Sequence, residues 1–405
     1  MGHREDRVGM NGAETPWPCW IEVDLDAIEH NVAALRDLVG PSCQVMAVVK
    51  AQAYGHGALP VAMAALEAGA TWLAVARVQE GVQLREAGVD APVLLLGPFT
   101  DTEVPLIVRW ELRPTLVNPR QAAELSRAAA ASGRMVPVHV KVDTGLGRYG
   151  ASVEELRTLL REMGSMPALR LEGLYSHFAT AEDPDGSYAS SQLETFRAVH
   201  AMLEGEGFRF PLLHMGNSGG ALGVEGSHLD MVRIGLSLYG LHPSPHLVPR
   251  AALRPALSLH SRIARVFPLQ PGQSVGYGRI FVATEPRIAA LIPVGYADGL
   301  PRSHSNRGFV LVNGRRSRLI GRISMDQCVA DVTEVGPVAE GDPVVLIGSQ
   351  GETAITCEEF AQRSGTISYE VLTSLGYRVP RVYRRGGDIV GVAYLDQGRY
   401  VSWSP

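Results

Sequence analysis

The sequence has 405 residues, of which 46% are hydrophobic and 20% charged, so it is long enough for two or three domains with large cores. Its formal net charge of -5 shows no basic excess, which argues against nucleic acid or an anionic membrane surface and favours a small-molecule partner. The four cysteines are scattered without metal-like spacing, which predicts reduced thiols in a cytosolic protein and no metal site.

Residues 1–18 are polar and rich in Gly, Arg and Asp. They show neither the apolar stretch of a signal peptide nor helical periodicity, so we expect a disordered leader. The most apolar later stretch, residues 58–76, contains Glu67 and Gly69 and is too interrupted to span a bilayer. No transmembrane segment is therefore expected, and a cytoplasmic location is predicted.

From residue 45 to about residue 240, short apolar runs alternate with helical segments, which is typical of βα units around a parallel sheet. Residues 119–131 are nearly all good helix formers, and residues 152–163 begin with a capping box of Ser152 and Glu155. We predict an α/β fold, a closed (β/α)8 TIM-type barrel over residues 19–250. An open doubly wound sheet typically has fewer strands and a glycine-rich phosphate turn, which is missing here. The eight runs are residues 45–49, 72–76, 93–96, 113–117, 136–142, 169–176, 212–215 and 231–234.

After residue 250 the sequence changes to strands rich in Val, Ile and Gly, which predicts a mostly β domain over residues 251–405. A hairpin signal, Asn313-Gly314, lies between the runs 309–312 and 319–320. One helix is predicted in this domain, near residues 357–363. The first strand of the chain, at residues 20–23, belongs either to the barrel or to this β domain.

Polar side chains stand where the predicted barrel strands end, which is the edge where such barrels gather their chemistry. Lys50 closes the first run, and an amine held beside apolar walls is a usable nucleophile towards carbonyls such as aldehyde cofactors. Taken alone, Lys50 would be interpreted as a strand-terminal lysine reaching solvent. The other polar residues at these ends are Lys141, Asp143, Arg148, His177, Asn217, Ser218 and Arg233, with Gly235 marking the end of the eighth run.

Lys50 lies in the segment VVKAQAYGHG, which resembles the pyridoxal-phosphate lysine motif of the alanine racemase family. Further similar motifs follow in the family's order, covering the chain from about residue 20 to 390. The resemblance implies a barrel plus β domain, pyridoxal 5'-phosphate as cofactor, an amino-acid substrate, and a homodimer whose active sites are shared between subunits. These motifs are KVDTGLGRYG (141–150), YSHFATAED (175–183), HMGNSGG (214–220), RIGLSLYG (233–240), VGYG (275–278), PVGYADG (293–299), GRISMDQ (321–327) and ISYE (367–370).

The resemblance also implies a set of cofactor-binding residues. Hydroxyl groups and backbone amides after the last two barrel strands would bind the phosphate, as donors without a bulky wall. Ser218 alone would be interpreted as a helix N-cap. The implied set is Lys50, Tyr54, His177, Asn217, Ser218, Arg233, Gly235, Leu236 and, from the β domain, Tyr369.

Arg233 resembles the family residue that faces the ring nitrogen of the cofactor. A guanidinium donates hydrogen bonds but does not hand over a proton, so the ring would stay largely neutral and transamination would be suppressed. His214 would hold Arg233 in place. Without the motif, a salt-bridging surface arginine and a core histidine would be the preferred interpretation.

Racemisation through a planar carbanion needs a proton donor and an acceptor on opposite faces of the substrate. By resemblance, Lys50 serves one face once the substrate has formed its own aldimine, and Tyr277 of the partner subunit serves the other. Tyrosine ionises near pH 10, so His177, hydrogen-bonded to Tyr277, would tune it. Taken alone, Tyr277 would be a packed strand aromatic.

The resemblance assigns substrate contacts to Arg148 and to the backbone of Met325. Lys141 matches a lysine often carried as a carbamate, whose negative charge would orient Arg148. The alternative for Lys141 is an ion pair with Asp143 or with Asp326. We assign a supporting role to Lys141, His214 and Asp326.

The leading hypothesis is an alanine racemase that interconverts L- and D-alanine for peptidoglycan. The same motifs permit a broader amino-acid racemase acting on serine or lysine. A decarboxylase of the same fold needs no second base and usually has an acid at the ring nitrogen, so Tyr277 and Arg233 argue against it. A non-catalytic pyridoxal-phosphate carrier would resemble a single barrel. The predicted β domain, which bears Tyr277 and Tyr369, argues against this alternative.

Overall fold

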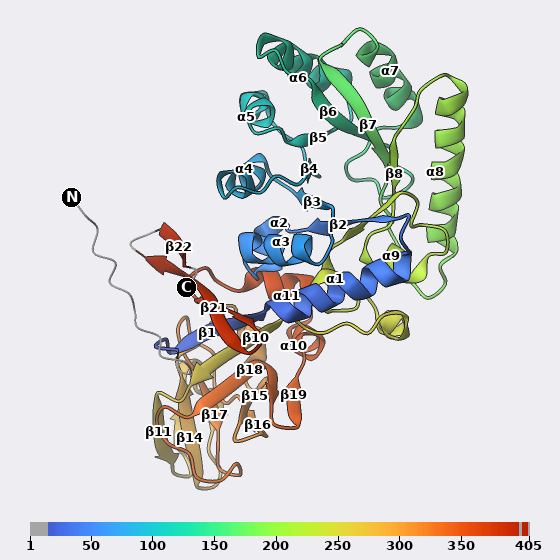
Figure 1. Cartoon of the computed structure of the whole chain (residues 1–405). Coiled ribbons are helices and arrows are strands. Elements are labelled where there is room, and N and C mark those ends of the chain that lie inside the picture. Colours follow the sequence, from blue (N-terminus) through green and yellow to red (C-terminus); the bar gives the residue numbers. More distant parts are fainter. Residues whose placement is uncertain (1–14, 397–398, 404–405) are drawn as a thin grey trace, which may run out of the picture. The chain divides into compact units, whose positions relative to one another are not determined.

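The computed structural model describes residues 15–396 and 399–403, so most of the expected leader, residues 1–18, lies outside the described residues. The chain divides into two compact units (Figure 1). One unit is Ala27–Pro255. The other combines the segment that ends at Asp26 with the chain from Ala256 onward.

The unit Ala27–Pro255 contains a closed barrel of eight parallel strands, which confirms the predicted α/β barrel fold. The barrel closes where β2 pairs with β9, with Met46 opposite Arg233. Residues 45–49 are all buried, as expected for a parallel strand covered on both faces. The strands are β2 (Gln44–Val48), β3 (Trp72–Val75), β4 (Val93–Leu95), β5 (Arg113–Leu116), β6 (Val136–Lys141), β7 (Leu169–Tyr175), β8 (Leu212–His214) and β9 (Met231–Ile234).

Helices alternate with these strands and surround the barrel (Figure 1). The two helices predicted in detail are confirmed. Asn118 caps the first of them, and Ser152 and Glu155 form the expected capping box of the second. The helices are α1 (Leu25–Val39), α2 (Lys50–Tyr54), α3 (Ala58–Glu67), α4 (Val78–Glu86), α5 (Val104–Arg109), α6 (Pro119–Ala131), α7 (Val153–Met163), α8 (Ser187–Gly205) and α9 (Ser218–Gly223), with the 3-10 turns η1 (Asp101–Glu103), η2 (Leu236–Tyr239) and η3 (Pro245–Arg250).

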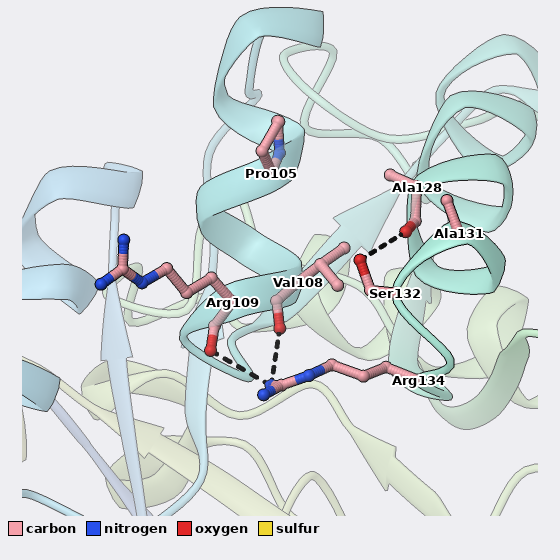
Figure 2. Close-up of a pocket in the computed structure, with 7 residues that line it drawn as sticks. All are labelled: Pro105, Val108, Arg109, Ala128, Ala131, Ser132 and Arg134. Atoms are coloured by element: carbon pink, nitrogen blue, oxygen red, sulfur yellow. Dashed lines mark hydrogen bonds between the residues drawn. The ribbon is translucent and has the colours of Figure 1, made fainter.

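A surface cavity of about 460 Å³ lies between α5 and α6, on the outside of the barrel (Figure 2). Arg134 lines it and donates to the carbonyls of Val108 and Arg109, both at 3.1 Å, at the C-terminal end of α5. Its guanidinium also pairs with Glu111 at 2.9 Å. A cation at the C-terminal end of a helix interacts favourably with the helix dipole. The Arg134 side chain therefore acts as a C-terminal cap of α5.

The second unit is mostly β and holds a nine-stranded sheet, a three-stranded sheet and a two-stranded ribbon. In the largest sheet, β1 (Cys19–Asp24) lies between β10 (Leu257–Arg262), its antiparallel neighbour, and β20 (Arg381–Arg385), its parallel neighbour. The remaining strands are β11 (Arg265–Leu269), β12 (Ser274–Val275), β13 (Phe281–Val282), β14 (Arg287–Ile292), β15 (Phe309–Val312), β16 (Arg315–Arg318), β17 (Cys328–Asp331), β18 (Pro343–Gln350), β19 (Thr353–Ile355), β21 (Asp388–Asp396) and β22 (Arg399–Trp403).

Two details of this unit differ from the predictions. The hairpin turn is at Asn313-Gly314 as predicted, but its second strand is β16, Arg315–Arg318, and ends before Leu319. The polar sequence Arg-Arg-Ser-Arg hides this strand from a hydrophobicity pattern, because its side chains are mostly exposed. The predicted helix is present as α10 (Cys357–Ser364), but a second helix, α11 (Ser368–Ser374), follows it, together with the 3-10 turns η4 (Tyr277–Arg279) and η5 (Arg302–His304).

Among the described residues, 15–396 and 399–403, no helix is both long enough and apolar enough to cross a lipid bilayer. In the same part of the chain, no group of three or more His, Cys, Asp or Glu side chains could hold a metal ion.

Candidate active site

Lys50 stands directly after the first barrel strand, at the start of an unusual turn. The four residues that follow it, Ala51 to Tyr54, all have φ between 51° and 54°, which is the left-handed helical region. The Ala53 amide donates to the Val49 carbonyl at 2.8 Å, and the Gly55 amide donates to the Ala51 carbonyl at 3.0 Å. For residues with a Cβ atom this conformation costs about 1–2 kcal/mol each. Surrounding contacts must therefore hold the turn in place.

The Lys50 amine lies in a setting that favours its neutral form. Burial lowers the pKa of Lys50, and the nearby Arg148 guanidinium lowers it further, whereas Glu80 opposes the shift. A lowered pKa raises the fraction of unprotonated amine near neutral pH. The expectation of a nucleophilic lysine at this edge therefore has a physical basis in the structure.

A cradle of hydroxyl groups and amides lies after β8 and β9. The Ser218 hydroxyl accepts from the amides of Gly235 at 3.0 Å and Ser237 at 3.2 Å, which leaves its own proton to donate. A Cβ atom on Gly235 would lie 2.6 Å from the Tyr54 hydroxyl, so only glycine fits there. Burial raises the pKa of Tyr54 to about 12, which keeps that phenol a donor.

The neighbour of Ser218, Asn217, takes the capping role that the sequence left open. Asn217 is the N-cap of α9, and its side chain accepts from the Gly220 amide at 2.8 Å. Ser218 is therefore not the helix cap and can face the cradle. Leu236 begins the 3-10 turn η2 at the same place.

Arg233 is a buried cation on β9, with 3% of its surface exposed. One of its terminal nitrogens, Nη1, donates to Nδ1 of His214 at 2.8 Å. The other, Nη2, donates to Nδ1 of His177 at 3.0 Å and to the carbonyls of Ser176 at 2.8 Å and Met215 at 3.1 Å. Burial lowers the pKa of Arg233 to about 10, so it remains charged at neutral pH. The alternative of a surface arginine in a salt bridge does not describe this residue.

The two histidines that accept from Arg233 are neutral. Burial lowers the pKa of His177 and of His214 well below the usual value, and the Arg233 charge adds to both shifts. Tyr175 stacks on the His214 ring with 4.6 Å between ring centres, which fixes the ring plane.

A chain of contacts continues from His214 through the barrel interior. Nε2 of His214 lies 2.8 Å from Nδ1 of His139, a fully buried residue on β6. Nε2 of His139 lies 3.5 Å from the Glu172 carboxylate on β7, which also pairs with Arg113 at 3.2 Å. Sequence reasoning missed His139 and Glu172, although both sit on predicted strands as polar interruptions of apolar runs.

Lys141, at the end of β6, is 5% exposed and packs its amine against two aromatic faces. Its Nζ lies 5.3 Å from the centre of the Tyr175 ring and 5.7 Å from that of Tyr149. Burial lowers the pKa of Lys141 to about 7, with further contributions from Arg233 and Arg148. A large part of this amine is therefore neutral at physiological pH.

Asp143 organises the loop that carries Arg148. Its carboxylate accepts from the amides of Gly145 at 2.8 Å, Gly147 at 2.9 Å and Arg148 at 3.2 Å. Those amides lower the pKa of Asp143 although its partial burial opposes the shift. Asp143 thus shapes the loop, in place of the ion pair with Lys141 that was the alternative expectation.

The other candidate residues belong to the β unit. Tyr277 opens η4 between Gly276 and Gly278 and is 73% exposed, so it is not the packed strand aromatic of the alternative interpretation. The Met325 carbonyl accepts from the Ala297 amide at 3.0 Å. Asp326 forms an ion pair with Arg378 at 2.8 Å, and Arg378 also pairs with Asp298. Tyr369 lies on α11.

Ser237 is a further residue that sequence reasoning did not single out. Its amide donates to Ser218, and its own buried hydroxyl finds no hydrogen-bond partner among the described residues. Its position in the segment RIGLSLYG, two residues after Gly235, is the signal that could have identified it. A buried hydroxyl of this kind suits a bound acceptor such as a phosphate oxygen.

A closed barrel with a partly buried lysine at a strand end, and with hydroxyl groups, amides and a buried arginine after the last strands, is typical of barrel enzymes, whose chemistry gathers at the strand ends. A family model described as alanine racemase, N-terminal domain, matches residues 23–243. A second model, alanine racemase, C-terminal domain, matches residues 256–383. The chain therefore belongs to the alanine racemase family.

Individual relatives agree with this membership. An alanine racemase of Synechocystis sp. is 43% identical over 364 residues, which cover 90% of this chain and 98% of the relative. The crystal structure of alanine racemase from Bacillus anthracis with bound L-Ala-P is 37% identical, covers 94% of this chain and 98% of its own, and superposes with a TM-score of 0.89. Alanine racemase from Bartonella henselae, with covalently bound pyridoxal phosphate, is 30% identical, covers 91% of this chain and 100% of its own, and has a TM-score of 0.82.

Proposed function

We propose that this protein interconverts L-alanine and D-alanine, with pyridoxal 5'-phosphate as cofactor, and thereby supplies D-alanine for peptidoglycan. We propose further that it acts in the cytoplasm as a homodimer with shared active sites. The observation that carries the proposal is the 43% identity to an alanine racemase over nearly that protein's whole length, barrel and β unit together. The site residues proposed below all stand in motifs of that family.

The residues present fit the cofactor. A phosphate needs several donors and no bulky wall, and the cradle offers the hydroxyls of Tyr54, Ser218 and Ser237 beside Gly235, where a Cβ atom would collide. We assign the phosphate to this cradle, with Asn217, the amide of Leu236 and Tyr369 of the β unit as further contacts. Lys50 would hold the aldehyde carbon. When bound there, pyridoxal phosphate makes the proton on the substrate Cα acidic by withdrawing electrons.

Arg233 would face the ring nitrogen of the cofactor. Its guanidinium is fixed by two neutral histidines and two carbonyls, and its pKa of about 10 keeps it a donor that does not release a proton at neutral pH. A donor of this kind leaves the ring nitrogen unprotonated and so weakens the electron withdrawal. This restraint favours return of the proton to Cα over transamination.

Proton transfer on opposite faces of Cα is assigned to Lys50 and to Tyr277 of the partner subunit. The lowered pKa of Lys50 suits a residue that accepts and returns a proton near neutral pH. Since Arg233 donates to Nδ1 of His177, the proton of that neutral ring lies on Nε2. An Nε2–H directed at the phenol oxygen would favour the ionised form of Tyr277 of the partner subunit.

The substrate carboxylate is assigned to Arg148 and to the backbone of Met325, with His214, Lys141 and Asp326 as supporting residues. The neutral fraction of the Lys141 amine can add carbon dioxide and, with loss of a proton to solvent, form a carbamate, and burial between aromatic rings would shield that group. A carbamate would place a negative charge beside Arg148 and orient it. Asp326, the residue after Met325, pairs with Arg378.

The purified protein with pyridoxal phosphate should be incubated with single enantiomers of alanine, serine and lysine, and the products separated on a chiral column. We expect alanine to be racemised from both directions much faster than serine or lysine. Borohydride reduction followed by peptide mapping should fix the cofactor mass on Lys50. Comparable rates for all three amino acids would replace the proposal by a broad-specificity racemase, and no racemisation of alanine would refute it.

A further inference from the structure

Glu80, on α4, divides its carboxylate between two segments. One oxygen, Oε2, accepts from the amides of Ala76 at 2.8 Å and Arg77 at 2.9 Å, where α4 begins. The other oxygen, Oε1, accepts from the Ala51 amide at 2.6 Å, in the first residue after Lys50. Glu80 therefore caps a helix and binds the left-handed turn with the same group.

The left-handed conformation of the turn that Glu80 binds is energetically unfavourable for the residues that form it. Ala51, Gln52, Ala53 and Tyr54 all adopt φ near +50°, and none of them is glycine, the residue that tolerates this region without strain. Gln52 is held as well, because its side chain accepts from the Ala58 amide at 3.3 Å and lies 3.5 Å from Gln83, one turn beyond Glu80 on α4. The turn is thus held by Glu80 and Gln83 of α4 and by Ala58 of α3, and Glu80 supplies a charged contact at Ala51.

We propose that Glu80 is a positioning residue: by binding the Ala51 amide it keeps the chain after Lys50 in the left-handed turn, and so aims the Lys50 amine at the substrate. The inference rests on the proposed function, because it concerns the base assigned there. A shift of about 1 Å in a reacting group can cost about 100-fold in rate, so a strained turn beside the catalytic amine needs such an anchor.

The substitution Glu80→Gln distinguishes the two roles of the carboxylate, which are to cap α4 and to bind the Ala51 amide. A carboxamide has one acceptor oxygen, so it can cap α4 or bind Ala51, but its nitrogen would face an N–H donor at the other place. Glu80→Gln therefore removes one of the two anchors while it keeps the size of the side chain. Glu155→Gln is the matched control, since Glu155 caps α7 through the Ser152 amide at 2.7 Å in the same capping-box position and contacts no site residue.

The first experiment compares the full-length protein and these two variants, each saturated with pyridoxal phosphate. For Glu80→Gln we expect kcat for alanine to fall about 10- to 100-fold with KM changed less than about threefold. We also expect faster hydrogen exchange in the peptide spanning residues 50–57, measured by mass spectrometry. Glu155→Gln should leave kcat and the exchange of residues 50–57 as in the parent protein.

The second experiment changes the cost of the turn itself. In Ala51→Gly the left-handed conformation carries no Cβ strain, so combining it with Glu80→Gln should recover at least about threefold of the lost kcat and part of the lost protection. Ala51→Val, made with Glu80 intact, should lower kcat and speed exchange, because a β-branched residue resists this conformation. If Glu80→Gln does not fold, Ala51→Val still tests whether the conformation of this turn controls kcat.

Unchanged exchange at residues 50–57 in both Glu80→Gln and Ala51→Val would overturn the inference, as would an equal loss of kcat in Glu155→Gln or no recovery with Ala51→Gly. The exchange readout needs no substrate. If the parent protein failed to racemise alanine, the proposed function would be lost, whereas the link between Glu80 and the turn would still be decided by exchange.

Discussion

The guanidinium of Arg233 donates to Nδ1 of His214 at 2.8 Å, and this bond sets the direction of a hydrogen-bond chain through the barrel interior. Arginine has no acceptor, so Nδ1 of the neutral His214 ring must be unprotonated and its proton must lie on Nε2. That Nε2–H then donates to Nδ1 of His139, whose own proton faces Glu172.

The tautomers of these rings are therefore predicted. His214, His177 and His139 should all carry their proton on Nε2, because each Nδ1 accepts a hydrogen bond. Nitrogen-15 NMR of histidine-labelled protein near pH 7.5 distinguishes the two tautomers by the shifts of the ring nitrogens. Arg233→Leu should release the constraint on His177 and His214. An Nδ1–H signal for His214 in the parent protein would contradict the chain.

The stability of the protein should fall in weak acid. The pKa values of His177 and His214 are well below 6.5 in the folded state, chiefly through burial, whereas in the unfolded chain they titrate near 6.5. The unfolded state therefore binds more protons as the pH falls below about 6.5. Each histidine then lowers the free energy of unfolding by about 1.4 kcal/mol per pH unit until its folded pKa is reached.

Denaturant unfolding of the parent protein and His214→Gln at pH 7.5, 6.5 and 5.5 measures this effect. The substitution itself changes stability at every pH, so the slope of the unfolding free energy against pH is the relevant quantity. The slope should be shallower in His214→Gln. Identical slopes would show that His214 takes up a proton equally in both states.

Gly235→Ala should weaken cofactor binding. The new Cβ atom would lie 2.6 Å from the Tyr54 hydroxyl and push it out of the cradle. Overpacking of this kind costs about 1–3 kcal/mol, which corresponds to about a 5- to 150-fold higher Kd for pyridoxal phosphate. Absorbance titration of the cofactor-free protein measures that constant. Gly205→Ala is a suitable control because no atom lies within 4 Å of the new Cβ there, and its Kd should equal that of the parent.

Tyr277→Phe should affect the two enantiomers unequally. Without the phenol, removal of the Cα proton from one enantiomer loses its base and should slow by about 100-fold or more, while the exchange that depends on Lys50 should persist. Proton NMR in deuterium oxide, started separately from L- and D-alanine, measures loss of the Cα signal in each direction. Equal losses from both enantiomers would argue against bases on opposite faces.

Much of the fold could be predicted because its patterns are local. The barrel strands are largely apolar runs, as β2 and β6 show. The capping box of Ser152 and Glu155 indicates the start of α7 within four residues. The strand β16 could not be recognised, since an exposed edge of Arg-Arg-Ser-Arg carries no hydrophobic period.

The candidate site divides in the same way. Strand-end residues such as Lys50 and Arg233 could be identified by position and motif. The left-handed turn at Ala51–Tyr54 could not, because none of its residues is glycine and the Glu80 carboxylate that binds it lies almost thirty positions away. His139 and Glu172 were missed for a related reason, since their contacts to His214 and to each other form only when β6, β7 and β8 are assembled in the barrel.

The pairing of β1 with β10 and β20 has a consequence for synthesis of the chain on the ribosome. The segment Cys19–Asp24 is translated before the barrel, yet both of its neighbours, Leu257–Arg262 and Arg381–Arg385, are translated after the entire barrel. All barrel strands are thus synthesised while the segment Cys19–Asp24 still lacks both of the strands that pair with it. Nascent chains that stall between these points would present that ribbon to chaperones or to one another.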